Sequence, residues 1–276
     1  MPKKKITYSL IIVLFITALI LAGIIFYSQS RKLKVVFLDV GQGDSILISR
    51  GSNQILIDGG VSGQKVLEKL GEYVPFWDRD IEILLATHPD ADHITGLVAV
   101  MEKYEVGAVI DNGVASQSQV YAKFKETIEN RKINEIEGRS GLRIKIGEDA
   151  EMEIVAPDGT QPKDNPKDTN ASSIVSKLTY GENKFLFTGD ISYDNEKVLV
   201  DSSRDIRADY LKVSHHGSKY ATSQMFLDRV KPRAAIVSVG ADNRYGHPSP
   251  DVIARLEENK IEVRRTDQEG DVEYNF

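Results

Sequence analysis

Short runs of branched and aromatic residues alternate with longer amphipathic stretches along most of this chain. The short runs are bounded by Gly, Asp or Asn, which is typical of buried strands. They predict strands at Leu33–Val40, Ser45–Ser49, Gln54–Asp58, Ile81–Thr87, Val106–Asp111, Leu142–Ile146, Glu151–Ala156, Ser172–Thr179, Lys184–Thr188, Tyr210–Ser214, Ala234–Val239 and Glu262–Arg264. The amphipathic stretches predict helices at Lys65–Glu72, Thr95–Tyr104, Gln119–Lys132, Tyr193–Asp201, Ser223–Val230 and Pro250–Asn259. Paired strands come first and alternating strands and helices later, so we expect one domain with sheets packed together and helices outside.

The first thirty residues follow a different pattern. Three lysines at positions 3–5 precede an uncharged run from Ile6 to Tyr27, and these 22 residues suffice to cross a bilayer as one helix. A cleaved signal peptide is the alternative, but its apolar stretch is usually shorter, and Ala22-Gly23 is a poor cleavage site. We therefore expect residues 1–30 to form a basic cytoplasmic stub and a single-pass membrane anchor. Residues 31–276 would then lie outside the cytoplasm.

Composition narrows the classes of function. The 276 residues include no cysteine, which excludes disulfides, cysteine-based zinc sites, iron–sulfur clusters and a cysteine nucleophile. The net charge of −6 argues against a general nucleic-acid coat protein, so any contact with nucleic acid must be local. The polar, proline-rich stretch Pro157–Thr169 predicts an exposed loop, which either borders a site or is a plain surface insertion.

The histidines carry the sharpest chemical signal. A lone histidine is more often a satisfied core or surface residue than a ligand, but here each one follows a predicted strand and sits beside Asp, Gly or Pro. Strand ends are where a rigid scaffold presents ligands on loops. The chain has five, namely His88, His93, His215, His216 and His247.

The densest cluster is the segment from His88 to His93, directly after a predicted strand. His88, Asp90, Asp92 and His93 offer four ligands within six positions, and imidazole and carboxylate groups bind borderline and hard divalent cations. A helix predicted to begin near Ile94 offers another explanation for Asp92, as a helix cap. Capping does not explain His88 and Asp90 together.

Three further strand ends carry candidate groups. Asp190 follows Thr188-Gly189, a pattern that alone is ordinary turn chemistry. His215 and His216 are adjacent after a strand, so their side chains should point to opposite sides and only one should bind metal. His247 lies in a loop whose Arg244 is a candidate anion contact.

Taken in order, these motifs resemble those of the metallo-β-lactamase superfamily. The resemblance rests on Leu-Ile-Asp58-Gly-Gly, His88-x-Asp90-x-Asp92-His93, Thr-Gly-Asp190 and Ser-His215-His216-Gly. It is closer to the metallo-β-lactamase-like domain of ComEC-type DNA-internalisation competence proteins, through the segments Asp39–Ser45, Thr87–Gly96, Leu211–Ser218 and Tyr245–Ser249. The resemblance covers Leu33–Phe276 and implies an α/β (α+β) fold, a four-layer αββα sandwich with its site on loops at one edge.

The resemblance also implies roles for individual residues. Asp190 would bridge two metals, Asp92 and His93 would hold one of them with His215 as the late histidine ligand, and His88 with Asp90 would begin the other site. Asp58 would orient ligands. Two family histidines are replaced, by Asp90 and by Asn170, so the first site is richer in oxygen. We expect one or two divalent cations, with manganese or magnesium favoured over zinc.

The expected chemistry is hydrolysis by a metal-activated water. Asp92 would orient the water, and His247 or His216 would protonate the leaving oxygen. The leading interpretation is a membrane-anchored metal-dependent hydrolase of phosphodiesters, a nuclease if the substrate is DNA. The alternatives are an acyl, lactam or lactone hydrolase, since fold does not determine function, and a non-catalytic metal-binding scaffold.

Two other features leave alternatives open. The glycines of Asp39–Ser45 either let the backbone approach the metal site or an anion, or simply form a tight turn between strands. Trp77, the single tryptophan, is expected to pack or to anchor a loop together with Phe76 and Tyr73.

Overall fold

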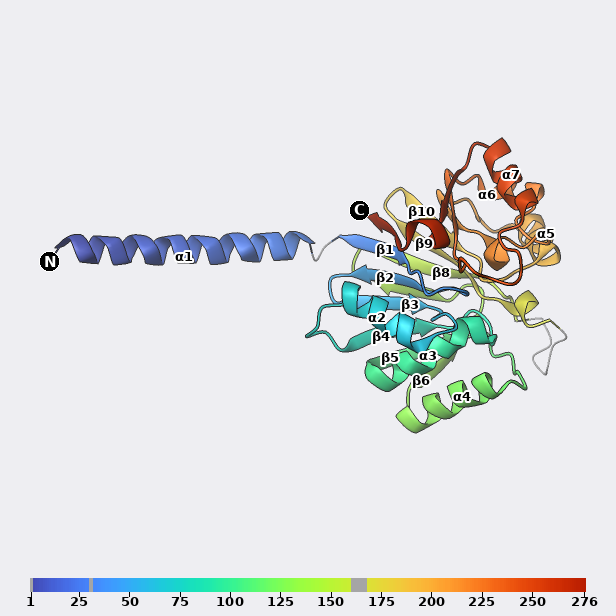
Figure 1. Ribbon diagram of the computed structural model, residues 1–276, viewed down its shortest axis with the longest axis horizontal. Coiled ribbons are helices and arrows are strands. Elements are labelled where there is room, and N and C mark those ends of the chain that lie inside the picture. Colours follow the sequence, from blue (N-terminus) through green and yellow to red (C-terminus); the bar gives the residue numbers. More distant parts are fainter. Residues whose placement is uncertain (1, 30–31, 160–167) are drawn as a thin grey trace.

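Two seven-stranded sheets pack face to face in the computed structural model, which describes residues 2–29, 32–159 and 168–276 (Figure 1). In spatial order, the first sheet contains β14 (Val272–Asn275), β1 (Leu33–Phe37), β2 (Ile46–Arg50), β3 (Asn53–Ile57), β4 (Asp80–Leu85), β5 (Glu105–Asp111) and β6 (Asn134–Glu137). The second contains β13 (Glu262–Arg265), β12 (Ala234–Val237), β11 (Tyr210–Lys212), β10 (Asn183–Phe187), β9 (Val175–Tyr180), β8 (Ala150–Ala156) and β7 (Arg143–Ile146).

Helices cover the outer face of each sheet. The first sheet is covered by α2 (Gly63–Tyr73), α3 (Ala91–Lys103) and α4 (Gln119–Arg131) (Figure 1). The second is covered by α5 (Tyr193–Asp201), α6 (Gln224–Val230) and α7 (Pro250–Glu258). Shorter helical segments are η1 (Asn170–Ser172), η2 (Ser214–Gly217) and α8 (Thr266–Glu269). These four layers confirm the αββα sandwich expected from the sequence.

The sequences of the strands are continuous apolar runs because both faces of each strand are buried. In β1, Val35 and Phe37 point into the core between the sheets, whereas Val36 packs in the core under the helices. Successive side chains of a strand point to opposite faces, so a strand between two cores needs apolar residues at every position. Phe37 meets Phe187 of β10 across the inner core, with ring centroids 6.1 Å apart.

The structure differs from the predicted elements at β6, at β14 and at the start of α3. Strands β6 and β14 are absent from the prediction because each is short and alternates with polar residues at the rim of its sheet. Helix α3 begins at Ala91, earlier than the predicted start. The predicted loop at Pro157–Thr169 falls mostly on residues 160–167, which lie outside the described residues.

Strand direction places the loops that carry chemistry at one edge. Strands β1, β3, β4, β5 and β6 run parallel to one another, because β2 is antiparallel to both β1 and β3. In the second sheet β10, β11, β12 and β13 are parallel. The carboxyl ends of parallel strands share an edge of a sheet, and ligands bind there in open α/β sheets.

Helix α1 (Pro2–Gln29) precedes the sandwich and stands away from it (Figure 1). The large apolar side chains described on it, from Tyr8 to Leu21, are 50–69% exposed. Among the residues that the structure describes, no helix combines the length and the apolarity needed to cross a membrane.

Candidate metal centre

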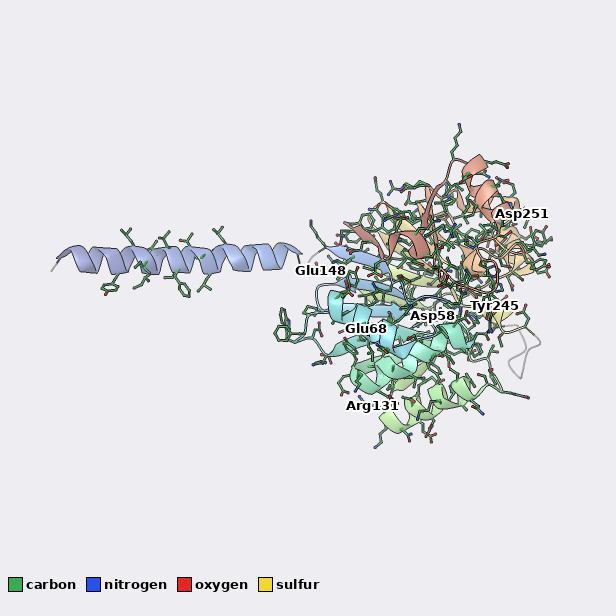
Figure 2. The ribbon with its side chains drawn as sticks, in the orientation of Figure 1. Asp58, Glu68, Arg131, Glu148, Tyr245 and Asp251 are labelled. Atoms are coloured by element: carbon green, nitrogen blue, oxygen red, sulfur yellow. The ribbon has the colours of Figure 1, made fainter. Side chains whose placement is uncertain are left out.

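Five strand ends bring the predicted residues together. The connection after β1 carries Asp44, β3 ends before Asp58, and β4 leads to His88 and α3. From the second sheet, β10 leads to Asp190 and β11 leads to the two adjacent histidines. The labelled Tyr245 lies on the side of the sandwich away from α1, and Asp58 lies nearer its middle (Figure 2). The cluster is therefore built from both sheets at their shared edge.

Asp58 is buried and fixes the orientation of His93. Its carboxylate accepts hydrogen bonds from the backbone N–H of Thr87 (2.8 Å) and the Thr87 hydroxyl (2.7 Å), and it lies 2.8 Å from Nδ1 of His93. Its φ of 56° is left-handed, a conformation that Asp tolerates better than most residues. This arrangement agrees with the orienting role that the resemblance implies for Asp58.

The start of α3 places Asp92 and His93 in the first turn of a helix, whereas the sequence predicted them on the preceding turn. Asp90 is the N-cap residue, but its side chain makes no capping bond. Instead it accepts a hydrogen bond from the Thr169 hydroxyl (2.6 Å), and its other oxygen lies 3.8 Å from Nε2 of His88. Asp90 is therefore tied to the segment before η1, at the rim of the cluster.

Asp190 occupies the centre of the cluster. Its Oδ2 lies 3.3 Å from Nε2 of His93, 3.2 Å from Nε2 of His216 and 4.0 Å from Nε2 of His215. Nε2 of His216 also lies 3.6 Å from Oδ2 of Asp92. The resemblance names His215 as the late histidine ligand, but the side chain of His215 is 31% exposed at the rim and that of His216 is buried inside. The geometry thus favours His216.

The backbone explains why sequence alternation did not distinguish the two histidines. His215 and His216 have φ values of 48° and 53°, so both are left-handed within η2 rather than extended. The alternation of side chains holds for a strand and not for such a turn. His216 is the one buried in the cluster, but the expectation that the two side chains point to opposite sides is wrong, because Nε2 of each lies within 4.0 Å of Oδ2 of Asp190.

Two buried residues with no role assigned from the sequence support His216. Lys212 is fully buried at the end of β11, and its Nζ lies 2.9 Å from Oδ2 of Asp44. Oδ1 of Asp44 lies 3.3 Å from Nδ1 of His216. A lysine within an apolar strand and an aspartate in the glycine-rich Asp39–Ser45 segment are the signals that could have revealed this pair.

Glycine lets that segment approach the metal motif closely. A Cβ built on Gly43 would lie 1.8 Å from the carbonyl oxygen of Asp92, and Gly43 has a φ of 103°. Only glycine allows both the contact and this backbone conformation. Of the two interpretations of Asp39–Ser45, close approach of the backbone to the metal motif is the one that the geometry supports.

The charges of the cluster favour cations. Burial alone would lower the pKa of His93 and His216, but neighbouring carboxylates, above all Asp190, raise the pKa of both well above the ordinary value. Burial alone would raise the pKa of Asp190 and Asp92, yet these two histidines hold both pKa values below the ordinary one. For His88, burial and the nearby His93 lower the pKa. The carboxylates thus create a field that attracts positive charge.

The hydrogen bonds of the histidines leave one ring nitrogen of each facing the cluster. Nδ1 of His93 faces the Asp58 carboxylate, and Nδ1 of His216 lies 2.9 Å from the carbonyl oxygen of Ser238. Nδ1 of His88 lies 3.0 Å from the Thr87 hydroxyl, whose hydrogen is donated to Asp58. In each case Nδ1 faces an acceptor and donates to it, so Nε2 is the nitrogen that faces the cluster and would bind a cation once it loses its proton, as in metal-binding imidazoles.

Buried polar atoms without partners test whether these residues fit a metal. Nε2 of His88, His93 and His216 has no hydrogen-bond partner among the described residues, and the same holds for one carboxylate oxygen of Asp190 and the side-chain oxygen of Asn170. Such atoms are costly unless an ion or water satisfies them. The groups able to hold an ion are His88–His93–Asp190, Asp92–His93–His216, Asp44–Asp58–His93 and Asp44–Asp190–His216. Nitrogen and oxygen donors at these spacings fit divalent cations.

A cleft opens over the cluster. Its volume is about 220 Å³, and its lining residues are Gln42, Asp90, Asp92, Asn170, Asp190, His215, His216, Tyr245 and His247. The rings of Tyr245 and His247 stack with centroids 5.9 Å apart, and the His247 ring also meets the His215 ring edge-on at 5.7 Å. His247 therefore borders the cleft beside His215 and outside the candidate metal groups.

Comparison with known proteins gives relatives along most of the chain. ComE operon protein 3 of Bacillus subtilis (strain 168) is 32% identical over 268 residues, which cover 90% of this chain and 33% of that protein. Competence protein ComA of Neisseria gonorrhoeae is 27% identical over 264 residues, which cover 94% of this chain and 35% of that protein. This chain spans about a third of the length of the curated relatives it matches.

The fold and the sequence agree on a family. The crystal structure of YhfI from Bacillus subtilis, a metallo-beta-lactamase fold protein, has a TM-score of 0.60 and 13% identity and covers 88% of this chain and 100% of that one. The family model described as the metallo-beta-lactamase superfamily matches residues 38–241. The chain therefore belongs to the metallo-beta-lactamase superfamily, and its curated relatives are competence proteins of the ComEC type.

Proposed function

We propose that this protein is a membrane-anchored phosphodiesterase that uses divalent metal to hydrolyse DNA outside the cytoplasm. The superfamily fold suggests a metal-dependent hydrolase in general. The observation that carries the narrower proposal is the oxygen-rich side of the cluster. There, Asp90 and Asn170 line the cleft, Asp90 lies 3.8 Å from His88, and the side-chain oxygen of Asn170 is buried without a partner among the described residues.

Oxygen donors favour manganese and magnesium over zinc, and these are the metals that paired sites use for phosphoryl transfer. Divalent cations held by His88, Asp92, His93, Asp190 and His216 would supply Lewis-acid stabilisation of phosphoryl oxygens and lower the pKa of a water molecule. Asp92 faces the cleft and can orient that water. His216 has its Nδ1 on Ser238 and its Nε2 in the cluster, so it serves as a ligand. This leaves His247 as the histidine placed to exchange a proton with a leaving group.

The relatives support DNA as the substrate. Two of them are named for the ComE operon and for competence. The acidic chain, with its net charge of −6, requires that the attraction for a polyanion be local. Cations bound in the cleft would provide it, since bound metal ions are the largest local charges of a site.

The membrane anchor rests on the amino-acid sequence, since no helix within the described residues has the length and apolarity to cross a membrane. The apolar side chains described on this helix extend from Tyr8 to Leu21, and the uncharged run in the sequence is longer, from Ile6 to Tyr27. The lysines at positions 3–5 would keep the amino terminus in the cytoplasm. The cleft would then face outward, since Tyr245, which lines it, lies on the side of the sandwich away from α1 (Figure 2).

The direct test measures DNA cleavage by the full chain in mild detergent. The protein is stripped of metal, supplied with manganese, magnesium or zinc, and given end-labelled single- and double-stranded DNA. Asp190→Ala removes the central carboxylate, and Asp228→Ala removes an exposed carboxylate on α6 as the matched control. We expect manganese-dependent cleavage in the wild type and the control, and a loss of at least about 100-fold in Asp190→Ala.

Two results would contradict the proposal. Full metal-dependent cleavage by Asp190→Ala would show that the cluster is not the active site. Absence of cleavage with every metal, although two equivalents bind, would refute a phosphodiesterase and point to an ester or lactam substrate.

Addition of protease to intact cells tests the orientation of the protein in the membrane, because a sandwich outside the cell is digested and one inside the cell is protected.

A further inference from the structure

An exposed aromatic pair lies in the connection between α2 and β4. The side chain of Phe76 is 82% exposed and that of Trp77 is 65% exposed. Their rings contact each other edge to face, with centroids 4.8 Å apart and planes at 82°. The sequence predicted packing or loop anchoring for these residues, but the structure turns both rings toward solvent.

The loop that carries the pair is held in place by its backbone and by polar neighbours. The N–H of Asp78 donates to the carbonyl oxygen of Pro75 (2.8 Å), and the Gln54 side chain donates to the Asp78 carboxylate (3.0 Å). The N–H of Glu105 donates to the carbonyl oxygen of Arg79 (2.8 Å). The two rings are thus presented outward by an ordered turn.

This loop lies at the edge of the sheet where the chain leaves α1. Strands β1, β3 and β4 are parallel, so the start of β4, just after the loop, lies at the same edge as the start of β1. A direct contact confirms it, because Nζ of Lys34 in β1 lies 5.4 Å from the centre of the Tyr73 ring at the end of α2. Four peptide links join Gln29 of α1 to Leu33, which limits their separation to about 14 Å.

The metal cluster lies at the other edge. Figure 1 shows the α2–β4 connection on the side of the sandwich that faces α1, and Figure 2 shows Glu148 on that side and Tyr245 on the opposite one. Strand β4 alone separates the aromatic pair from the segment that begins at His88, and its six residues span about 20 Å. The pair therefore has no place in the catalytic cleft.

Charges at this edge are of both signs and partly neutralised. Arg50 lies 2.7 Å from Asp149, and Lys34 lies 3.9 Å from Glu273. Such an edge is unsuited to nucleic acid or to strongly anionic lipid. Aromatic side chains without a basic patch are typical of residues that sit at the level of lipid headgroups, with Trp the most characteristic.

We propose that Phe76 and Trp77 form a second membrane contact, which rests in the headgroup region of the bilayer that α1 enters. The inference rests on the membrane attachment proposed above. With α1 and the aromatic pair both in the bilayer, the sandwich would be fixed with this edge toward the membrane. The metal cleft would then lie about one strand length from the bilayer and open to the exterior. The partner is a zwitterionic lipid surface, and the contact is insensitive to salt because it uses no net charge.

The single tryptophan allows a direct test on the full chain. The protein is reconstituted in phosphatidylcholine vesicles, and flotation in a density gradient measures attachment. Fluorescence of Trp77 is then compared in vesicles with and without brominated lipid, which quenches tryptophan within the bilayer. The control moves the tryptophan to the far side of the sandwich by Trp77→Tyr with Val198→Trp, since Val198 is 67% exposed on α5.

The expected result is flotation, a blue-shifted Trp77 emission and strong quenching by brominated lipid that is unchanged in high salt. The relocated tryptophan should show none of this quenching. Flotation with Trp77 quenched no more than the relocated tryptophan would overturn the second contact and leave the anchor in place. Absence of flotation would overturn the anchor, and the second contact with it.

Discussion

The buried ion pair between Lys212 and Asp44 gives a sharp prediction about stability. The side chains of both residues are almost completely inaccessible to solvent, and Lys212 also donates a hydrogen bond to the carbonyl oxygen of Val213 (2.8 Å). Burial alone would raise the pKa of Asp44, but Lys212 and His216 lower it below the ordinary value. Lys212→Met keeps the length of the apolar stem and removes the charge, so the buried Asp44 carboxylate loses its strongest partner.

The magnitude follows from burial. Breaking one partner of a buried pair costs about 3–5 kcal/mol, because the remaining charge stays desolvated. At about 2–4 °C per kcal/mol for a domain of this size, the melting temperature should fall by about 6–20 °C. Lys212→Met with Asp44→Asn removes both charges, and we expect it to recover more than half of the loss.

The assay is thermal unfolding of the full chain in mild detergent, followed by far-ultraviolet circular dichroism with chelator present so that bound metal does not mask the effect. Lys197→Met is the matched control, since Lys197 pairs with Asp201 at 3.1 Å on the exposed face of α5. Such a surface pair contributes little to stability, because water and salt screen it. A shift for Lys212→Met no larger than that of Lys197→Met would refute the reasoning.

Three further predictions concern packing and metal. Gly96→Ala should destabilise the fold by about 1–3 kcal/mol in the same thermal unfolding assay, because the new Cβ would lie 1.8 Å from the carbonyl oxygen of Gly59. The control Gly71→Ala, with open space around it in α2, should stabilise by up to about 1 kcal/mol, and equal effects would contradict this. His216→Ala should weaken manganese binding by more than about 100-fold in calorimetry, and His215→Ala by less than tenfold; the reverse order would show that the rim histidine is the ligand. Manganese at 100 times its dissociation constant should stabilise the protein by about 2.7 kcal/mol, raising the melting temperature by about 5–11 °C, and no shift would mean that the folded state binds no metal.

The sandwich was predictable because its strands have two buried faces. In β1, Val35, Val36 and Phe37 are apolar in succession, and each meets a core on its own side. Strands β6 and β14 lack this signal, since polar residues interrupt both. Their pairing depends on neighbours that are distant in the sequence, such as Val35 opposite Tyr274, and no local pattern encodes that contact.

The sequence motifs identify most of the residues of the candidate site, but they do not predict how the side chains are arranged within it. His88, Asp92, His93 and Asp190 could be found because metal ligands are concentrated where strands end. The inward turn of His216 depends on two left-handed residues that no composition rule predicts. Lys212 supports His216 through its contact with Asp44, which lies 168 positions earlier in the chain, in the connection after β1.

The cluster draws its groups from both sheets, with His93 and Asp190 almost a hundred positions apart along the chain. A nascent chain that ends before β10 holds Asp58, His88 and His93 but lacks Asp190, the carboxylate that meets His93. The three candidate groups that include Asp190 or His216 therefore form only after both halves of the chain have come together. Closure of the two sheets on each other is thus the folding step that completes these groups.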